Sequence, residues 1–245
     1  MAEYKARLGT VAATGAVIDE GLRAYMLRVY NYMASGLALT GIIAFGAANT
    51  PAVLNLLYQV GPDGFLRPTM LAWVVMFAPF GFILVMSFGI HKLKASTAQT
   101  LFWLFAGVMG LSLAHVFLVF TGASIARVFF ITAGTFGAMS LYGYTTKRDL
   151  TRFRSFLFMG LIGVILASLV NVFIGSSMMQ FAISVIGVIV FVGLTAYDTQ
   201  RIKNSYDVTP EGEAQAKMAI MGALSLYLNF INLFILLLHL FGSRR

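Results

Sequence analysis

The chain has 245 residues, of which 59% are hydrophobic and 11% are charged. Soluble domains carry about 25% charged residues, so the polar side chains here are too few to coat a soluble surface. The composition predicts an all-α integral membrane protein that lies in a lipid bilayer. The net charge of +8 falls in short basic clusters between apolar runs, which membrane topology explains better than a nucleic-acid partner does.

The predicted elements begin after a polar N-terminal segment. Residues 1–28 contain no apolar stretch typical of a cleavable signal peptide, and we interpret them as a cytoplasmic N-terminal tail. A spanning helix needs about 20 mostly apolar residues. Within a predicted transmembrane domain at 29–245, seven segments qualify: 29–48, 70–90, 98–120, 124–145, 153–174, 178–200 and 218–241.

The Lys and Arg residues predict the orientation of these spans. If the N-terminus is cytoplasmic, thirteen of the 17 basic residues fall on the cytoplasmic side, and Arg67, Arg127, Arg244 and Arg245 fall outside. Cytoplasmic loops of membrane proteins are enriched in Lys and Arg, so we predict a cytoplasmic N-terminus and an outer C-terminus. The Arg244–Arg245 pair opposes that bias, and a re-entrant last helix would place both ends in the cytoplasm.

Small residues recur at a spacing of four within the predicted spans. Ala106 with Gly110 and Ala133 with Gly137 are two such pairs. In membranes, this pattern lets helix backbones approach closely. We interpret both pairs as sites of close helix packing.

Two predicted spans carry polar residues on one face. In helix 218–241, steps of three and four residues align Gly222, Ser225, Asn229, Asn232, Leu236 and His239. In helix 178–200, the same steps align Ser184, Gly187, Phe191, Thr195 and Asp198. Polar groups in hydrocarbon cost free energy unless they are paired, so we expect both faces to meet protein or water.

Asp198 is the acidic residue in these two stripes, and it has two interpretations. It lies near the predicted cytoplasmic end of its helix, just before Arg201 and Lys203, where pairing with a base would be purely structural. Asn229 lies about 16 Å along helix 218–241 at 1.5 Å per residue, near mid-membrane. Asp198 and Asn229 meet only if helix 178–200 continues past Arg201 or helix 218–241 begins later.

Three stretches resemble a known family. "GLTAYDTQRIK" at 193–203 and "ALSLYLNFINLFILLLHLFG" at 223–242 resemble the C-terminal signature of the Bax inhibitor-1 family of membrane proteins. "RVFFITAGTFGAMSLYGYTTKRDL" at 127–150 is similar to its bacterial branch. That branch includes an inner-membrane protein that modulates a membrane-anchored AAA protease. The resemblance covers nearly the whole chain after about residue 20.

The resemblance implies six helices around a central, strongly apolar seventh, and a pH-sensitive calcium leak. In family members with that activity, two aspartates on helices six and seven share a proton. The first matches Asp198, and the second falls at Asn229. A neutral amide neither repels a carboxylate nor shares its proton. We therefore expect Asp198 and Asn229 to act as ion-path or gating residues of a calcium (cation) leak whose pH response differs from that of the two-aspartate members.

Further side chains are expected to support this pair. Thr195, Ser225 and Asn232 share its helix faces. The stretch that corresponds to the basic end of helix two in leak-active members contains His91 and Lys92. One of these two is expected to reach the helix-six carboxylate and to compete with Asn229. Calcium prefers six to eight oxygen ligands, and Asp198 offers one carboxylate among neutral oxygens. We expect no resident cofactor and a weak, transient Ca²⁺ site at Asp198.

Two other classes of function compete with a channel. An intramembrane aspartyl protease needs two carboxylates to activate water, and Tyr197–Asp198 supplies half of its signature without a Gly-x-Gly-Asp partner. His115 forms no recognisable set with a serine, so we expect no enzymatic activity. The alternative is a non-conducting regulator of membrane-protein proteolysis in the bacterial inner membrane, which binds an AAA protease through the tail at 1–28.

Overall fold

Long apolar runs fold as helices in a membrane because hydrocarbon offers no hydrogen-bond partner to a free backbone group. The computed structural model describes residues 2–61, 66–210 and 212–245. Its elements are α1 (Ala2–Ala48), α2 (Pro51–Leu57), β1 (Tyr58–Val60), β2 (Leu66–Pro68), α3 (Met70–Gly89), α4 (Ala95–Val119), α5 (Gly122–Thr145), the 3₁₀ turn η1 (Leu150–Phe153), α6 (Arg154–Ile174), α7 (Ser177–Val208) and α8 (Glu213–Phe241). Strands β1 and β2 form an antiparallel hairpin between α2 and α3.

Seven stretches of the described chain are long and apolar enough to span a membrane, as the sequence predicts. The largest difference from the predicted ranges is at the start of α1. Helices α7 and α8 are also longer than predicted at their facing ends, which leave a connection of 209–212. Charged residues end the apolar windows there, but they do not end the helices. Lys203 Nζ donates to the Tyr144 carbonyl oxygen (2.9 Å) and Lys217 Nζ donates to the Leu93 carbonyl oxygen (3.1 Å), so both ammonium groups are paired within helical segments.

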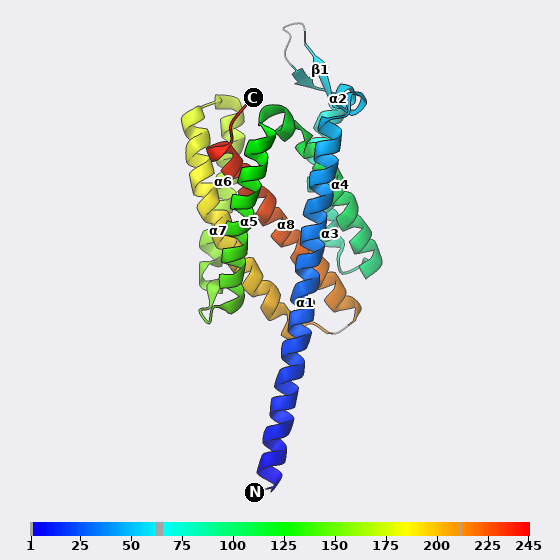
Figure 1. Cartoon of the computed structure of the whole chain (residues 1–245), viewed down its shortest axis with the longest axis vertical. Coiled ribbons are helices and arrows are strands. Elements are labelled where there is room, and N and C mark those ends of the chain that lie inside the picture. The colour runs from blue at the N-terminus through cyan, green and yellow to red at the C-terminus, as the bar shows by residue number, and fades with distance from the viewer. Residues whose placement is uncertain (1, 62–65, 211) are drawn as a thin grey trace.

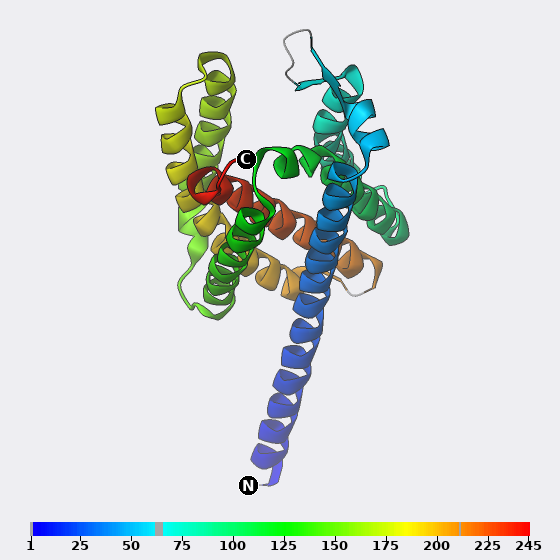
Figure 2. The same cartoon turned by 45° about the horizontal axis from the view of Figure 1, so that its top comes forward.

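Helix α8 is the central helix of the bundle. In its most apolar 18-residue window 72% of the residues are buried, against 17–39% in the other six spans. It packs against α1, α4, α5 and α7, and it crosses the middle of the bundle obliquely in both views (Figures 1 and 2). The predicted arrangement of six helices around a central C-terminal seventh is confirmed.

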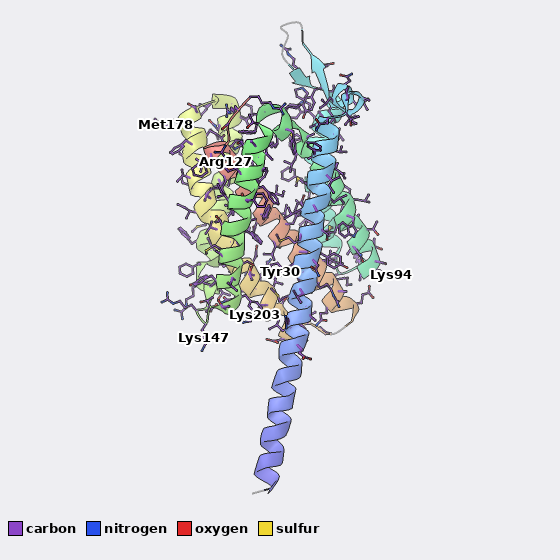
Figure 3. All side chains as sticks on the ribbon, in the orientation of Figure 1. Tyr30, Lys94, Arg127, Lys147, Met178 and Lys203 are labelled. Atoms are coloured by element: carbon purple, nitrogen blue, oxygen red, sulfur yellow. The ribbon has the colours of Figure 1, made fainter. Side chains whose placement is uncertain are left out.

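The two ends of the chain lie at opposite ends of the bundle (Figure 1). The C-terminal segment pairs with the α4–α5 turn through backbone hydrogen bonds from Thr121 to Ser243 (3.0 Å) and from Arg245 to Val119 (3.0 Å). Lys94 and Lys147 lie at the other end, toward the N-terminus (Figure 3). Because α8 runs uninterrupted from one end to the other, the alternative of a re-entrant last helix is wrong.

Helix α1 continues without a break from Ala2 to Ala48, and its candidate span begins at Glu20. The predicted boundary between a tail and a membrane domain, after residue 28, therefore lies inside a continuous helix. The first part of α1 extends past the rest of the bundle (Figure 1).

The two small-residue pairs differ in what surrounds them. A Cβ atom added at Gly110 would lie 2.8 Å from the Thr40 carbonyl oxygen and 2.8 Å from Ile43 Cβ, so α4 packs closely on α1 there. A Cβ atom added at Gly137 would meet no atom within 4 Å. Close packing is therefore confirmed for the pair that includes Gly110 and is wrong for the pair that includes Gly137, because α5 faces open space at that position.

Candidate functional site

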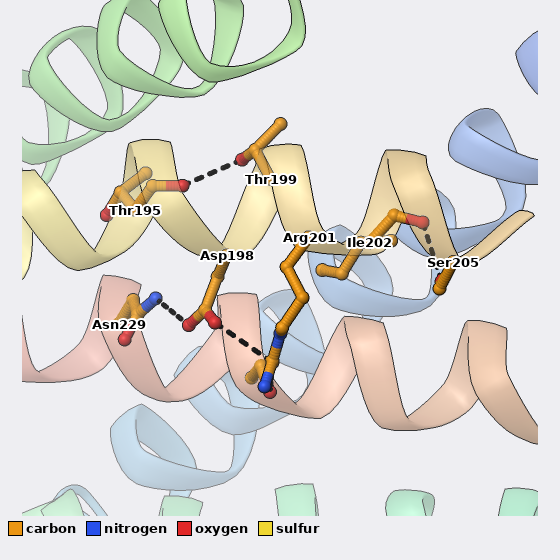
Figure 4. Close-up of polar contacts among 8 residues, drawn as sticks. Thr195, Asp198, Thr199, Arg201, Ile202, Ser205 and Asn229 are labelled. Carbon is orange, nitrogen blue, oxygen red and sulfur yellow. Dashed lines mark hydrogen bonds and ion pairs between the residues drawn. The ribbon is translucent and has the colours of Figure 1, made fainter. Parts of the chain in front are cut away.

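Asp198 and Asn229 meet between α7 and α8. Asn229 Nδ2 donates to Asp198 Oδ2 over 2.8 Å, and the two residues are 8% and 5% exposed. They can meet because α7 continues past Arg201 to Val208, which is one of the two conditions that the sequence set. The carboxylate is therefore held against an uncharged amide of the central helix (Figure 4).

The second partner of Asp198 is Arg201, one helical turn further along α7. Arg201 Nη2 lies 2.9 Å from Asp198 Oδ1, and the Arg201 side chain is 50% exposed. The same Nη2 donates to Ser225 Oγ on α8 over 3.1 Å. Both interpretations of Asp198 thus apply together, because its carboxylate pairs with a neighbouring base and with the buried amide.

The expected supporting residues have different roles from those predicted. Ser225 acts through Arg201. Thr195 Oγ1 donates to the Phe191 carbonyl oxygen (2.7 Å), and Asn232 Nδ2 donates to the Leu228 carbonyl oxygen (2.8 Å), so each bonds to its own helix. His91 is exposed in the turn after α3, and no described hydrogen bond or ion pair joins it to Asp198.

A hydroxyl chain on the other side of α7 was not predicted. Tyr30 OH lies 2.5 Å from Ser140 Oγ, which lies 3.0 Å from Thr199 Oγ1. Thr199 in turn donates to the Thr195 carbonyl oxygen over 2.8 Å. The chain links α1 and α5 to the helical turn that carries Asp198. The four-residue spacing of Thr195 and Thr199 was visible in the sequence, but their partners on other helices were not.

The turn before η1 also holds this part of α7. Gln200 accepts a hydrogen bond from the Leu150 backbone N–H (2.8 Å) and donates to the Arg148 carbonyl oxygen (2.8 Å). Within the turn, Asp149 Oδ1 accepts from the Thr151 backbone N–H (2.9 Å) and hydroxyl (2.6 Å). These two bonds hold the pKa of the exposed Asp149 carboxyl below its usual range. Both sides of the Asp198 turn are therefore fixed by polar contacts.

The site provides few ligands for a divalent cation. Calcium takes six to eight oxygens, and in this arrangement both oxygens of Asp198 already accept from protein donors. Among the described residues, no group of three or more His, Asp or Glu residues is placed to hold a metal. The described donor set is therefore smaller than a tight calcium site requires.

Seven apolar spans and a buried, paired carboxylate at the central helix define a multi-pass membrane protein with a polar site inside the bundle. A family model described as inhibitor of apoptosis-promoting Bax1 matches residues 22–245. The chain therefore belongs to the Bax inhibitor-1 family, as its sequence motifs predicted.

Similar proteins occur in several bacteria. An uncharacterised protein of Rickettsia prowazekii is 48% identical over 245 residues, which is 100% of both chains. The inner membrane protein YbhL of Escherichia coli is 49% identical over 227 residues, or 92% of this chain and 94% of that protein. An uncharacterised protein of Deinococcus radiodurans is 36% identical over 234 residues, or 96% of each chain.

Proposed function

We propose that this chain is a calcium-permeable cation leak of the bacterial inner membrane, with its N-terminus in the cytoplasm. The observation that carries the proposal is the buried Asp198 carboxylate, which is paired with the Arg201 guanidinium at the central helix. Burying a carboxylate inside a membrane protein costs free energy, and the cost rises to about 2.5–3.5 kcal/mol at the bilayer centre. A structural role alone does not require it, since an apolar side chain would pack there more favourably.

The arrangement described here is the closed state in this proposal. The contact between α7 and α8 forms a seam, and Asp198, Arg201 and Ser225 cross it. They lie on the side of this seam that faces the predicted cytoplasm. The half-exposed Arg201 side chain can turn into water without leaving a buried charge of its own. When it does so, Asp198 becomes available to a cation, and the seam loses one of its cross-links.

The same geometry argues against an enzyme. Asn229 stands where a second carboxylate would be needed to share a proton and activate water. We therefore propose that Asp198 performs no catalytic step, and that its ligand is the permeating ion.

Flux measurements test this proposal. In liposomes that enclose a calcium indicator, Arg201→Gln should speed calcium entry about ten-fold to a hundred-fold, since a hydrogen bond to a charged group contributes about 1.5–3 kcal/mol. Asp198→Asn should slow entry, because the permeating ion loses its carboxylate. Arg154→Gln is the matched control, since Arg154 is an exposed base at the same end of the bundle. Equal flux in all three variants and the unaltered protein would overturn the role of Asp198 and Arg201, and flux no greater than in protein-free liposomes would overturn the leak.

A second function is favoured by the length of α1. About 18 helical residues precede the candidate span and reach about 27 Å beyond it at 1.5 Å per residue, which gives a membrane-anchored AAA protease a segment to hold. If the chain is a non-conducting regulator, removal of residues 1–19 changes the turnover of membrane proteins in cells. If it is a leak, the same truncation leaves calcium flux in liposomes unchanged.

A further inference from the structure

A large apolar groove lies between α1 and α5, away from the Asp198 seam. Its volume is about 1090 Å³, and Phe230 of the central helix contributes to its lining. Small-molecule sites in proteins are about 300–1,000 Å³, so this groove is large enough for a ligand of that size or more. Leu27, Ile42 and Leu141 line it and are each more than half exposed. The groove therefore opens sideways, toward the hydrocarbon that surrounds the spans.

The two ends of the groove differ in chemistry. Toward the N-terminal end of the bundle its lining includes Arg23, Tyr30, Ser140 and Tyr144. Lys203 adds a second cation there, because its ammonium group donates to the Tyr144 carbonyl oxygen and lies 4.9 Å from the Tyr144 ring centre. Figure 3 shows Tyr30 and Lys203 close to the space between α1 and α5.

The remainder of the groove is apolar and contains small residues. On α1 the lining passes through Leu37, Ala38 and Gly41, and on α5 it passes through Ala133 and Gly137. A Cβ atom added at Gly41 or at Gly137 would meet nothing within 4 Å. The small residues on these two helices thus leave space in the groove, instead of bringing the two helices together.

We propose that this groove binds one anionic phospholipid from the leaflet at the N-terminal end of the bundle. The phosphate pairs with Arg23 and Lys203, and an acyl chain lies along Gly41, Ala133 and Gly137. The charge pattern favours a lipid over a partner helix. The two cations lie at one end, because Arg23 and Lys203 are each within four residues of the end of a candidate span, and the described lining contains no Asp or Glu. Basic residues near the membrane surface attract anionic lipid headgroups.

Lipid retention by the purified full-length chain tests the proposal. Native mass spectrometry compares phosphatidylglycerol and phosphatidylcholine with identical acyl chains. The unaltered protein should retain phosphatidylglycerol preferentially, and Arg23→Gln should reduce that retention about five-fold, the effect of one surface cation on an anionic lipid. Gly137→Leu should reduce the retention of both lipids, because its side chain fills the space for the acyl chain.

Two control variants keep the test specific. Arg28→Gln removes an exposed base from α1 outside the groove, and Gly163→Leu fills open space on α6; both should retain lipid as the unaltered protein does. If Gly137→Leu fails to fold, Arg23→Gln still tests the proposal, because Arg23 is exposed and its substitution should leave the fold intact. The proposal would be overturned if the unaltered protein retained the two lipids equally, or if the control variants lost as much lipid as Arg23→Gln and Gly137→Leu. It would also be overturned if a second copy of the chain occupied the groove in place of lipid.

Discussion

At the scale of single residues, the Asp198 carboxylate has one partner that is fixed and one that can leave. Asn229 is buried on the central helix and cannot move far, whereas half of the Arg201 side chain is exposed. Removing one member of a buried ion pair costs about 3–5 kcal/mol when the other charge is left buried. Loss of Arg201 leaves the buried Asp198 carboxylate with the neutral Asn229 amide and no counter-charge. Loss of Asp198 instead leaves Arg201 free to enter water. Substitution of Arg201 should therefore cost more stability than substitution of Asp198.

Asn229→Asp should give the site the proton chemistry that it lacks. The substituted oxygen would stand where an amide nitrogen now lies 2.8 Å from Asp198 Oδ2. Two carboxylates this close share a proton, and they titrate as a pair. We expect calcium flux through this variant in liposomes to rise as the pH falls, because the pair then takes up one proton. The rise should be at most about ten-fold for each pH unit.

Asn232→Asp is the matched control for that experiment. It lies on the same helix, but its side chain bonds to the Leu228 carbonyl oxygen and not to Asp198. Its flux should depend on pH as that of the unaltered protein does, over about pH 6 to 8. Our account of the aspartate–asparagine pair is wrong if Asn229→Asp and Asn232→Asp give the same pH profile.

The sequence predicted the two central residues of the site better than their surroundings. Helical spacing and the family resemblance both identified Asp198 and Asn229, because a polar residue in an apolar helix is conspicuous. The hydrogen-bond partners of the Thr195 and Asn232 side chains were not predictable. A hydroxyl or amide on a helix can bond to the preceding turn of its own helix as readily as to a neighbouring helix. The Ser140–Thr199 contact joins residues 59 positions apart, and no local pattern indicates such a pair.

At the scale of elements, the closest backbone contact near the site joins α5 and α7. A Cβ atom added at Gly143 would overlap the backbone carbonyl group of Ala196. Glycine is needed here for this close approach. The contact lies two residues before Asp198, so the packing of α5 against α7 helps to fix the turn that carries the carboxylate.

Gly143→Ala should therefore destabilise the protein. The added methyl group meets backbone, which cannot rotate away as a side chain can, and overpacking of this kind costs about 1–3 kcal/mol. Thermal unfolding in detergent, followed by helical circular dichroism, measures the loss. Gly134→Ala, on the same helix but with no atom within 4 Å of the added Cβ, should instead be neutral or gain up to about 1 kcal/mol from helix propensity. Equal unfolding midpoints for the two variants would contradict this reasoning.

Helix positions were predictable from hydropathy, whereas helix ends were less so. The predicted start of the second span at residue 70 coincides with the start of α3 at Met70, because Thr69 caps the helix by accepting from the Ala72 backbone N–H. The end predicted at residue 200 falls eight residues before the end of α7 at Val208. A run of charged residues marks the limit of hydrocarbon, and a helix stabilised by tertiary contacts continues into the polar interface beyond it.

At the scale of the whole molecule, the central helix connects distant parts of the bundle. Tyr227 on α8 is fully buried, and its hydroxyl lies 2.7 Å from Thr40 Oγ1 on α1. Thr40 also donates to the Ala106 carbonyl oxygen on α4 over 2.8 Å. One hydroxyl pair thus links three helices, in addition to the α7–α8 seam. Movement of α8 relative to α7 would therefore be transmitted to α1 and α4, which makes the central helix the element best placed to couple the site to the rest of the bundle.

The bundle is expected to lie in the membrane with its N-terminus in the cytoplasm, and the absence of cysteine from the sequence makes this orientation simple to test. Ser243→Cys places a thiol beside the α4–α5 turn, and Ser96→Cys places one at the first turn of α4, at the opposite end. Both serines are exposed, and neither change alters the charges that set topology. In intact spheroplasts, a membrane-impermeant maleimide should label Ser243→Cys, and it should label Ser96→Cys only after lysis. The reverse pattern would place the N-terminus outside, and with it the Asp198–Arg201 pair would face the other compartment.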